Sequence, residues 1–260
     1  MEEIQITQQE NIATVTINRP KVKNAVTPDM WAELERVFTT LSYQDDVRAV
    51  IVTGAGEDFC SGADVSGMAS RTDGPRVHQL DSMRKVGSCC LSLFNMPKVT
   101  IARISGVAVG AGMNLALCCD LVVASENARF SEIFAQRGLS VDFGGSFLLP
   151  RIVGLQKAKE LVLLAEVISA SKANEMGFVN YVVPRDELDE KVAELAARAA
   201  AGPPRALAMS KAMLNKSFSN SLQDALDEEG TSQTLNFTTK DITEAMQAFQ
   251  EKRSPRFNGW

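Results

Sequence analysis

Hydrophobic and polar residues follow two different periods along the first 200 residues and predict strands that alternate with helices. In residues 11–20, NIATVTINRP, β-branched residues alternate with polar ones, which is typical of a strand. Residues 27–44 carry apolar side chains at helical spacing, with Thr27 placed as an N-cap and Pro28 at the first helical position. Further strands are predicted in 47–56, 98–112, 121–131 and 179–184, and further helices in 74–96, 113–120, 155–165 and 169–178.

The pattern changes near residue 186, after which almost every segment is helical apart from the break at 202–205, GPPR. A helical region of about 60 residues has little core of its own. We therefore expect an α/β core in residues 1–200 and a helical region in 201–260. The helical region should pack on the core or on another subunit.

Composition and charge narrow the function. The chain has 260 residues, 45% of them hydrophobic and 23% charged, with a formal net charge of −5. This acidic balance argues against nucleic-acid or membrane-surface binding. The start, MEEIQITQQE, has no signal-peptide pattern, and the apolar run 107–119 is too short for a membrane span.

The cysteines and the histidine restrict the chemistry further. The five cysteines are odd in number and form no CxxC motif, so we interpret them as reduced residues of a cytoplasmic protein. His78 is the only histidine in the sequence and lies in a polar stretch. A Ser-His-Asp triad or a metal site is therefore not expected.

Two glycine-rich segments, 58–68 and 106–120, each lead from a strand through small residues to a helix start. Backbone N–H groups at such exits are unpaired and can bind an anion. If both exits face one point, they form an oxyanion hole from backbone alone. The alternative is a pair of ordinary strand-to-helix turns. Neither segment has a nucleotide-binding motif, because GxGxxG and GxxxxGK[ST] are both absent.

These segments resemble the enoyl-CoA hydratase/isomerase (crotonase) superfamily almost from end to end. The similar segments are TINRPKVKNAV, FCSGADVSGM, ISGVAVGAGMNLALCCDLVVASENARFS, SASKANEMGFVNYVVP and FQEKRSPRFNG. The resemblance implies an α/β fold with a spiral of ββα turns and a C-terminal helical trimerisation region. It further implies a homotrimer or a dimer of trimers, and an acyl-CoA thioester as substrate with no separate cofactor.

The resemblance also implies the parts of the binding site. The backbone N–H groups of Ala63 and Ala111 would hold the thioester oxygen. Backbone at Lys23 and Ala25 and from Ala63 through Asp64 to Val65 would contact the CoA moiety, and Gly110 would border the substrate. For the CoA phosphates, the candidates are Arg19, Lys21 and Lys23, although these three residues also fit an ordinary solvated basic turn.

Two positions depart from the hydratase pattern. Hydratases of the superfamily use two glutamates to handle water, and here those positions hold Asn114 and Phe134. An asparagine cannot titrate and a phenylalanine can neither titrate nor hydrogen-bond, so hydration lacks its acid and base. Glu132 lies two residues before Phe134. We expect it to be an exposed glutamate at a strand end, unless a shifted register turns it inward.

Asp142 stands between Val141 and Phe143 in RGLSVDFGG. By itself it fits a turn, where aspartate is common. Several isomerase branches of the superfamily have an acid at the same offset before the glycine pair, and the closest is the ring-opening isomerase of phenylacetate degradation. The resemblance therefore favours Asp142 as a buried base that faces the acyl chain.

One carboxylate and an oxyanion hole suit an allylic proton shift, so we predict an acyl-CoA isomerase. Three alternatives remain open. The chain can be an enoyl-CoA hydratase, or Asp142 can be a nucleophile as in the related aromatic-acyl-CoA dehalogenase. It can also be an acyl-CoA-binding or RNA-binding relative that has lost catalysis. Incubation with a 3-enoyl-CoA separates these classes.

Overall fold

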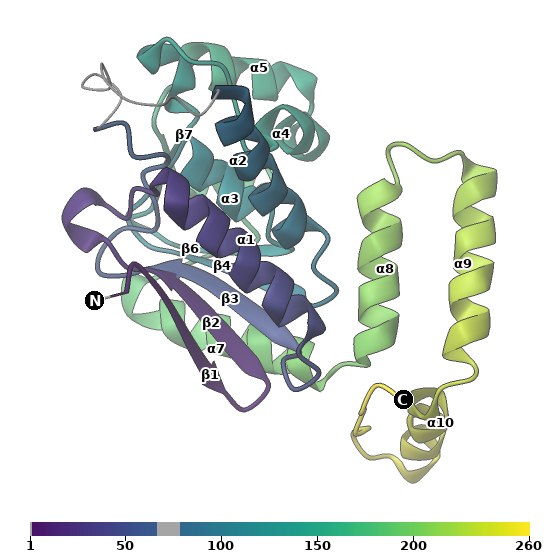
Figure 1. The fold of residues 1–260 in the computed structure, drawn as a ribbon. Coiled ribbons are helices and arrows are strands. Elements are labelled where there is room, and N and C mark those ends of the chain that lie inside the picture. Colours follow the sequence, from purple (N-terminus) through teal and green to yellow (C-terminus); the bar gives the residue numbers. More distant parts are fainter. Residues whose placement is uncertain (1, 67–78) are drawn as a thin grey trace.

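A mixed six-stranded sheet forms the centre of the computed structural model, which describes residues 2–66 and 79–260 (Figure 1). The strand order is β1-β2-β3-β4-β6-β9; β1 pairs with β2 antiparallel, and all later pairs are parallel. A smaller sheet has the order β5-β7-β8. The strands are β1 Ile4–Gln9, β2 Ile12–Ile17, β3 Ala49–Gly54, β4 Val99–Ile104, β5 Val107–Val109, β6 Leu121–Ser125, β7 Arg129–Ser131, β8 Ile168–Ser169 and β9 Tyr181–Val183.

Helices cover both faces of the main sheet, as expected for parallel strands that are buried on both sides. In Figure 1, α1 and α2 lie over one face and α7 over the other. Thr27 caps α1 as predicted, because its side chain accepts a hydrogen bond from the Met30 N–H. The helices of this core are α1 Pro28–Tyr43, α2 Gln79–Phe94, α3 Ala111–Leu117, α4 Gly145–Val153, α5 Leu155–Leu164, α6 Ala170–Glu175 and α7 Leu188–Ala201, with 3-10 turns η1 Pro20–Val22, η2 Ile133–Arg137 and η3 Arg185–Glu187.

Several boundaries differ from the sequence prediction. The expected single strand 121–131 is two strands, β6 and β7, because the chain turns at 126–128, where the Ala128 N–H donates to the Ser125 carbonyl. The turn sends β7 to the smaller sheet, beside β5. β1 and α4 were not predicted. The start of the predicted helix 74–96, with His78, lies outside the described residues.

The last 60 residues form three helices, α8 Pro204–Lys216, α9 Leu222–Asn236 and α10 Lys240–Glu251. In Figure 1, α8 and α9 stand side by side next to the core, with α10 and the C-terminus at one end of the pair. Lys211 on α8 donates to Asp120 of the core at 2.8 Å, and Asn215 donates to the Phe94 carbonyl at 3.0 Å. The α8 helix is therefore held by polar contacts against the start of β6 and the end of α2.

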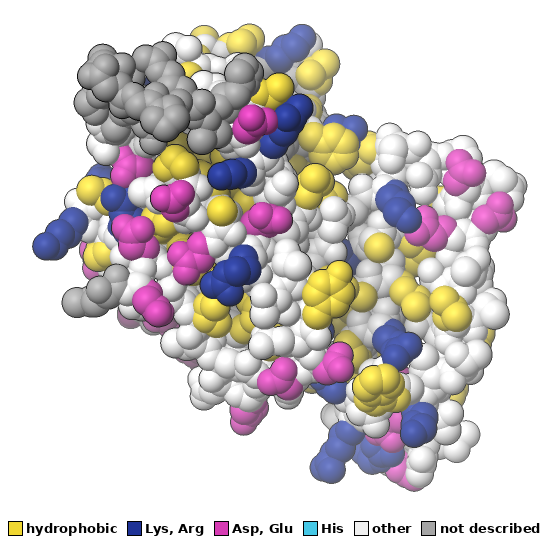
Figure 2. Space-filling model, viewed as in Figure 1, with side chains coloured by type: hydrophobic (Ala, Val, Ile, Leu, Met, Phe, Trp, Pro, Cys, Tyr) yellow, Lys and Arg dark blue, Asp and Glu magenta, His cyan; other side chains and the backbone are white. Residues whose placement is uncertain are grey.

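Large apolar side chains remain exposed on these three helices, and yellow side chains are visible over this part of the surface in Figure 2. Leu222 is 77% exposed and Phe249 is 82% exposed. Large contiguous exposed apolar patches are typical of interaction sites in proteins. The exposed set on these helices and the segments that follow them comprises Leu214, Phe218, Leu222, Leu226, Leu235, Phe237, Met246, Phe249 and Trp260. None of the helices in the described part of the chain is long and apolar enough to cross a bilayer.

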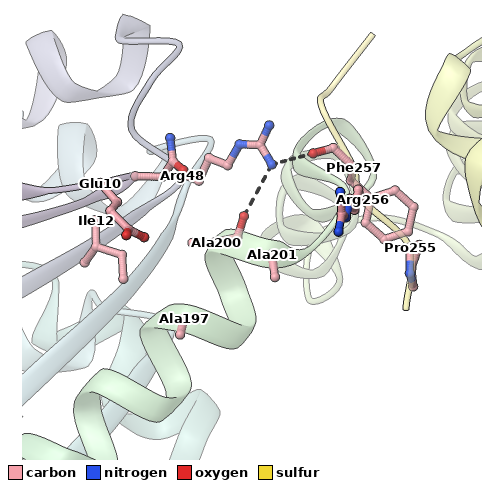
Figure 3. Close-up of a pocket in the computed structure, with 10 residues that line it drawn as sticks. Glu10, Ile12, Arg48, Ala197, Ala200, Ala201, Pro255, Arg256 and Phe257 are labelled. Carbon is pink, nitrogen blue, oxygen red and sulfur yellow. Dashed lines mark hydrogen bonds between the residues drawn. The ribbon is translucent and has the colours of Figure 1, made fainter. Parts of the chain in front are cut away.

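Arg48 connects the core to the C-terminal segment (Figure 3). Its guanidinium donates to the Phe257 carbonyl at 2.7 Å and to the Ala200 carbonyl at 3.4 Å. The side chain borders a cavity of about 310 Å³ between the start of β2, the end of α7 and residues 255–257. No residue predicted for the functional site lines this cavity. We therefore place the chemistry elsewhere.

Candidate active site

The two glycine-rich segments lie against each other, as an oxyanion hole requires. The Val109 N–H donates to the Cys60 carbonyl at 3.0 Å, and Cys60 pairs with Ala108 in a parallel bridge. Gly62 has φ of +94°, and a β-carbon there would lie 2.9 Å from the Val109 carbonyl oxygen and 3.4 Å from the Ala111 nitrogen. At Gly112 an added β-carbon would lie 2.3 Å from the Cys60 carbonyl oxygen. Only glycine permits this close approach of the two backbones.

The resemblance implies that the N–H groups of Ala63 and Ala111 are the oxyanion donors, and this role stays a prediction. Ala63 forms a parallel bridge with Val26, in which the neighbouring Gly62 carbonyl and Asp64 N–H make the hydrogen bonds to Val26. The Ala63 N–H points away from that partner. Ala111 is the first residue of α3, so its N–H has no acceptor within the helix.

The predicted CoA-contact residues lie on the loop around η1 and on the adjoining strand exit. Lys21 and Lys23 are exposed, and Lys23 has left-handed backbone with φ of 52°. The Lys23 carbonyl accepts from the Ser61 N–H at 2.9 Å, which joins this loop to the Ala63 segment. Ala25 is buried, and Val65 is exposed.

Arg19 is engaged within the protein. It donates to Asp64 at 2.8 Å and to the Ala25 carbonyl at 2.6 Å, and it pairs with Glu3 at 3.0 Å. Hydrogen bonds from Ser66 and Arg19 lower the pKa of Asp64 to about 2, so Asp64 stays ionised beside the arginine. Lys21 and Lys23, by contrast, are exposed and form no ion pair among the described residues, so these two of the three basic candidates remain predicted for the CoA phosphates.

Asn114 lies one turn after Ala111 on α3 and connects this helix to the Asp142 loop. Its Nδ2 donates to the Asp142 backbone carbonyl at 2.9 Å. The amide packs tightly against Gly145, where an added β-carbon would lie 2.5 Å from Nδ2. Asn114 is fully buried, and this contact brings Asp142 next to the α3 side of the site.

Asp142 is a partly buried carboxylate at the start of a strained turn. Its Oδ1 is buried and has no hydrogen-bond partner within the described ranges. Burial raises the pKa of Asp142 to about 6. Phe143, which follows it, has φ of 47° and is buried, with its ring 4.9 Å from that of Trp31. A buried aromatic side chain therefore follows the acid directly in the chain.

Glu132 contradicts its prediction. Its exposed fraction is 0%, so it is not an exposed glutamate at a strand end. Glu132 is buried without a shift in register. It follows the last residue of β7, Ser131, whose carbonyl accepts a hydrogen bond from the Gly110 N–H at 2.8 Å. The Glu132 Oε2 accepts from Asn114 Nδ2 at 3.3 Å. Burial raises the pKa of Glu132 to about 8; the Asn114 bond opposes this rise, and the nearby Asp142 charge adds to it.

Phe134, which holds the second hydratase glutamate position and was predicted to border the substrate, is a buried residue. It belongs to η2, and its ring lies 3.6 Å from the place where Gly110 would carry a β-carbon. Gly110 thus has Phe134 and Ile133 beside it and Ala111 after it.

All five cysteines, each within the described ranges, are buried and free. In those ranges no three His, Cys, Asp or Glu side chains group as metal ligands.

Comparisons with known proteins give the family. The sequence model of the Enoyl-CoA hydratase/isomerase family matches residues 7–259. The chain belongs to this family. Among its curated relatives, the 1,2-epoxyphenylacetyl-CoA isomerase of Escherichia coli K12 is 35% identical over 252 residues, with 96% of each chain covered. The crotonyl-CoA hydratase of Syntrophomonas wolfei is 35% identical over 263 residues, with 98% of each covered.

Solved structures show the same fold. The enoyl-CoA hydratase of Bacillus anthracis superposes with a TM-score of 0.93 at 31% identity and covers 100% of both chains. This enoyl-CoA hydratase/isomerase family member therefore has the crotonase fold, as the sequence resemblance predicted. Names of its relatives divide between hydratase and isomerase at equal identity, so the reaction has to be argued from the residues of its own site.

Proposed function

We propose that this family member is an acyl-CoA isomerase that moves a double bond from the 3- to the 2-position of an enoyl-CoA, or carries out a ring-type acyl-CoA isomerisation. The proposal rests on the environment of the Asp142 carboxyl group. It is a partly buried carboxyl group with a raised pKa, and it lies beside the α3 helix whose first N–H is the expected oxyanion donor. Such a group is a base suited to neutral pH.

The proposed chemistry starts with removal of a proton from C2 by Asp142. The thioester oxygen takes up the negative charge and is held by the N–H groups of Ala63 and Ala111, each worth on the order of 3 kcal/mol to such a transition state. Return of a proton at C4 completes the shift. In the simplest cycle, Asp142 carries the same proton from C2 to C4, and no water is consumed.

Substitution of Asp142 tests this proposal. Asp142→Asn keeps the shape and removes the base, so kcat for a 3-enoyl-CoA should fall about 10²-fold or more while KM hardly changes. Asp186→Asn, at an exposed aspartate, is the matched control and should be silent. Activity of Asp142→Asn within about threefold of the parent would return Asp142 to the role of a turn residue, because asparagine serves as well in turns.

Enoyl-CoA hydratase is the second candidate, and one observation favours it. Glu132 is a buried acid that contacts Asn114, the position at which hydratases carry a water-handling glutamate in the family pattern. One observation opposes a hydratase function: the second position at which hydratases carry a water-handling glutamate holds Phe134, which can neither orient nor deprotonate water. Measurement of crotonyl-CoA hydration separates the two candidates.

For the assembly we propose a homotrimer, or a dimer of trimers, formed through the helical region 201–260. The support is the set of exposed apolar side chains on α8, α9 and α10, which a monomer would leave in water. A subunit interface would bury these side chains and so account for apolar residues on the surface of the helical region.

A further inference from the structure

The proposed reaction cycle assigns no role to the buried carboxyl group of Glu132. Glu132 follows β7 directly and has an exposed fraction of 0%. Its Oε1 has no hydrogen-bond partner in the part of the chain that the structure describes. An unpaired buried polar group costs about 1–3 kcal/mol. A site that keeps such a group at this cost is expected to use it.

Glu132 and Asp142 share one amide group. The Asn114 Nδ2 donates to Glu132 Oε2 at 3.3 Å and to the Asp142 backbone carbonyl at 2.9 Å. The Oδ1 atoms of Asn114 and Asp142 are also buried without partners among residues 2–66 and 79–260. Three buried oxygens without partners therefore belong to residues that the Asn114 amide joins, and the Asp142 charge acts on Glu132. Their grouping makes Glu132 part of the same polar centre as the proposed base.

The surroundings of the pair decide how its protons divide. From α2, Cys90 faces the loop, with its Sγ 3.6 Å from the Phe143 carbonyl and 3.4 Å from the Cys118 Sγ of the α3 end. Within the described residues, no cation contributes to the pKa shift of either carboxyl. Burial raises the pKa of Asp142 to about 6, and burial together with the nearby Asp142 charge raises the pKa of Glu132 to about 8. Between these values one carboxyl is ionised and the other holds a proton, which is the division that acid–base pairs use.

We propose that Glu132 is a second catalytic carboxyl group, which gives its proton to C4 of the substrate while Asp142 takes the proton from C2. The C2–H bond breaks, and its electron pair passes into the thioester enolate. The C3–C4 π pair then forms the C4–H bond with the Glu132 proton as its O–H bond breaks, the C1–C2 π pair makes the C2–C3 double bond, and the oxygen restores the thioester carbonyl. One proton has moved from Glu132 to the substrate and one from the substrate to Asp142. Transfer of a proton from Asp142 to Glu132 restores the pair.

This inference rests on the proposed isomerase function and differs from it in the origin of the C4 hydrogen. A single turnover of a 3-enoyl-CoA in D₂O, with enzyme in excess, measures that origin. If Glu132 is the donor, it has exchanged with solvent, and the product carries deuterium at C4. If Asp142 instead carries the C2 proton to C4, the hydrogen added at C4 is the one removed from C2, and C4 gains no deuterium. Retained hydrogen in the parent enzyme overturns the inference without the use of any variant.

Glu132→Gln gives the second test, because a glutamine Oε1 can still accept from Asn114 while it can give no proton. We expect kcat to fall about 10²-fold with KM unchanged, deuterium at C4 to be lost, and the alkaline limb of the pH–rate profile to disappear. Glu126→Gln, at an exposed glutamate on the turn before β7, is the control and should match the parent. Unchanged kcat and unchanged C4 labelling in Glu132→Gln would overturn the inference.

A separate measurement distinguishes failure of this inference from failure of the proposed function. Exchange of the C2 hydrogens of a saturated acyl-CoA with D₂O needs only Asp142 and the oxyanion donors. Exchange that persists in Glu132→Gln, while the double-bond shift is lost, supports the assignment of Glu132. If exchange is lost as well, Glu132 only maintains the site and the inference is wrong. Absence of a double-bond shift in the parent enzyme would instead refute the isomerase function.

Discussion

Glu132→Gln should change the pH dependence of stability in a way that follows from burial of the carboxyl group. In the folded protein the pKa of Glu132 is raised from 4.5 to about 8. The folded state therefore binds this proton more tightly than the unfolded state does. Over the pH range between the two pKa values the folded state carries more protons, so the parent loses stability as pH rises. The glutamine variant has no proton at this position and escapes that loss.

The size of the effect follows from the two pKa values. Each pH unit between them is worth about 1.4 kcal/mol. Over the interval from 4.5 to about 8, the stability of Glu132→Gln relative to the parent should therefore rise by on the order of 5 kcal/mol in total. Below pH 4.5 and above pH 8 the difference should be flat. Asp142 titrates in both proteins and largely cancels in the comparison.

Urea unfolding of the two proteins at pH 5, 6, 7 and 8, at one protein concentration, measures the difference. Glu126→Gln should show no pH-dependent difference from the parent, because that side chain is exposed. A constant offset between Glu132→Gln and the parent across this range would refute the reasoning. It would mean that Glu132 is ionised in the folded protein, and it would remove the proton on which the second catalytic role depends.

Three further outcomes are expected. Hydration of crotonyl-CoA should run well below about 10 s⁻¹, a median enzyme rate, because Asn114 and Phe134 replace the two hydratase acids; a rate at that level would favour the hydratase. Light scattering at micromolar concentration should give a mass of three or six subunits, and a species of 28.2 kDa would contradict the assembly. Gly145→Ala should lower kcat, because its β-carbon would lie 2.5 Å from the Asn114 Nδ2 and displace the amide, whereas Gly87→Ala meets no atom within 4 Å and should stabilise α2 by up to about 1 kcal/mol in a thermal melt.

Local signals in the sequence were sufficient for much of the fold. The Thr27–Pro28 pair marked the start of α1, and the alternation in 11–20 marked β2. Two elements, β1 and α4, were not predicted from the sequence, and each has a physical reason. β1 is an edge strand with mostly exposed residues, so its hydrophobic signal is weak. α4 begins at two glycines and contains Pro150, so its local propensity opposes the helix that packing imposes.

In the candidate site, the resemblance singled out Asp142 and the two glycine-rich segments, whose roles stay predictions, whereas the expectation of an exposed Glu132 was wrong. A glutamate at the end of a short strand is usually exposed, and sequence spacing alone cannot show which side of the strand end faces the interior. Its burial depends on contacts with Asn114, 18 residues away along the chain. A signal was available in the sequence itself: Glu132 lies in the short stretch FSEIF, with Phe130 and Phe134 at its ends and Ile133 beside it.

The shared amide of Asn114 has a consequence for how related sequences can differ. A carboxylate at position 114 would face the Glu132 oxygen at roughly the distance that Asn114 Nδ2 now does, 3.3 Å, and two buried like charges at that separation repel strongly. Acids at positions 114 and 132 are therefore expected to be mutually exclusive across the family, so that the two columns of an alignment covary. A lineage that passes between the two arrangements has to change both positions, and its intermediates should carry a neutral residue at each.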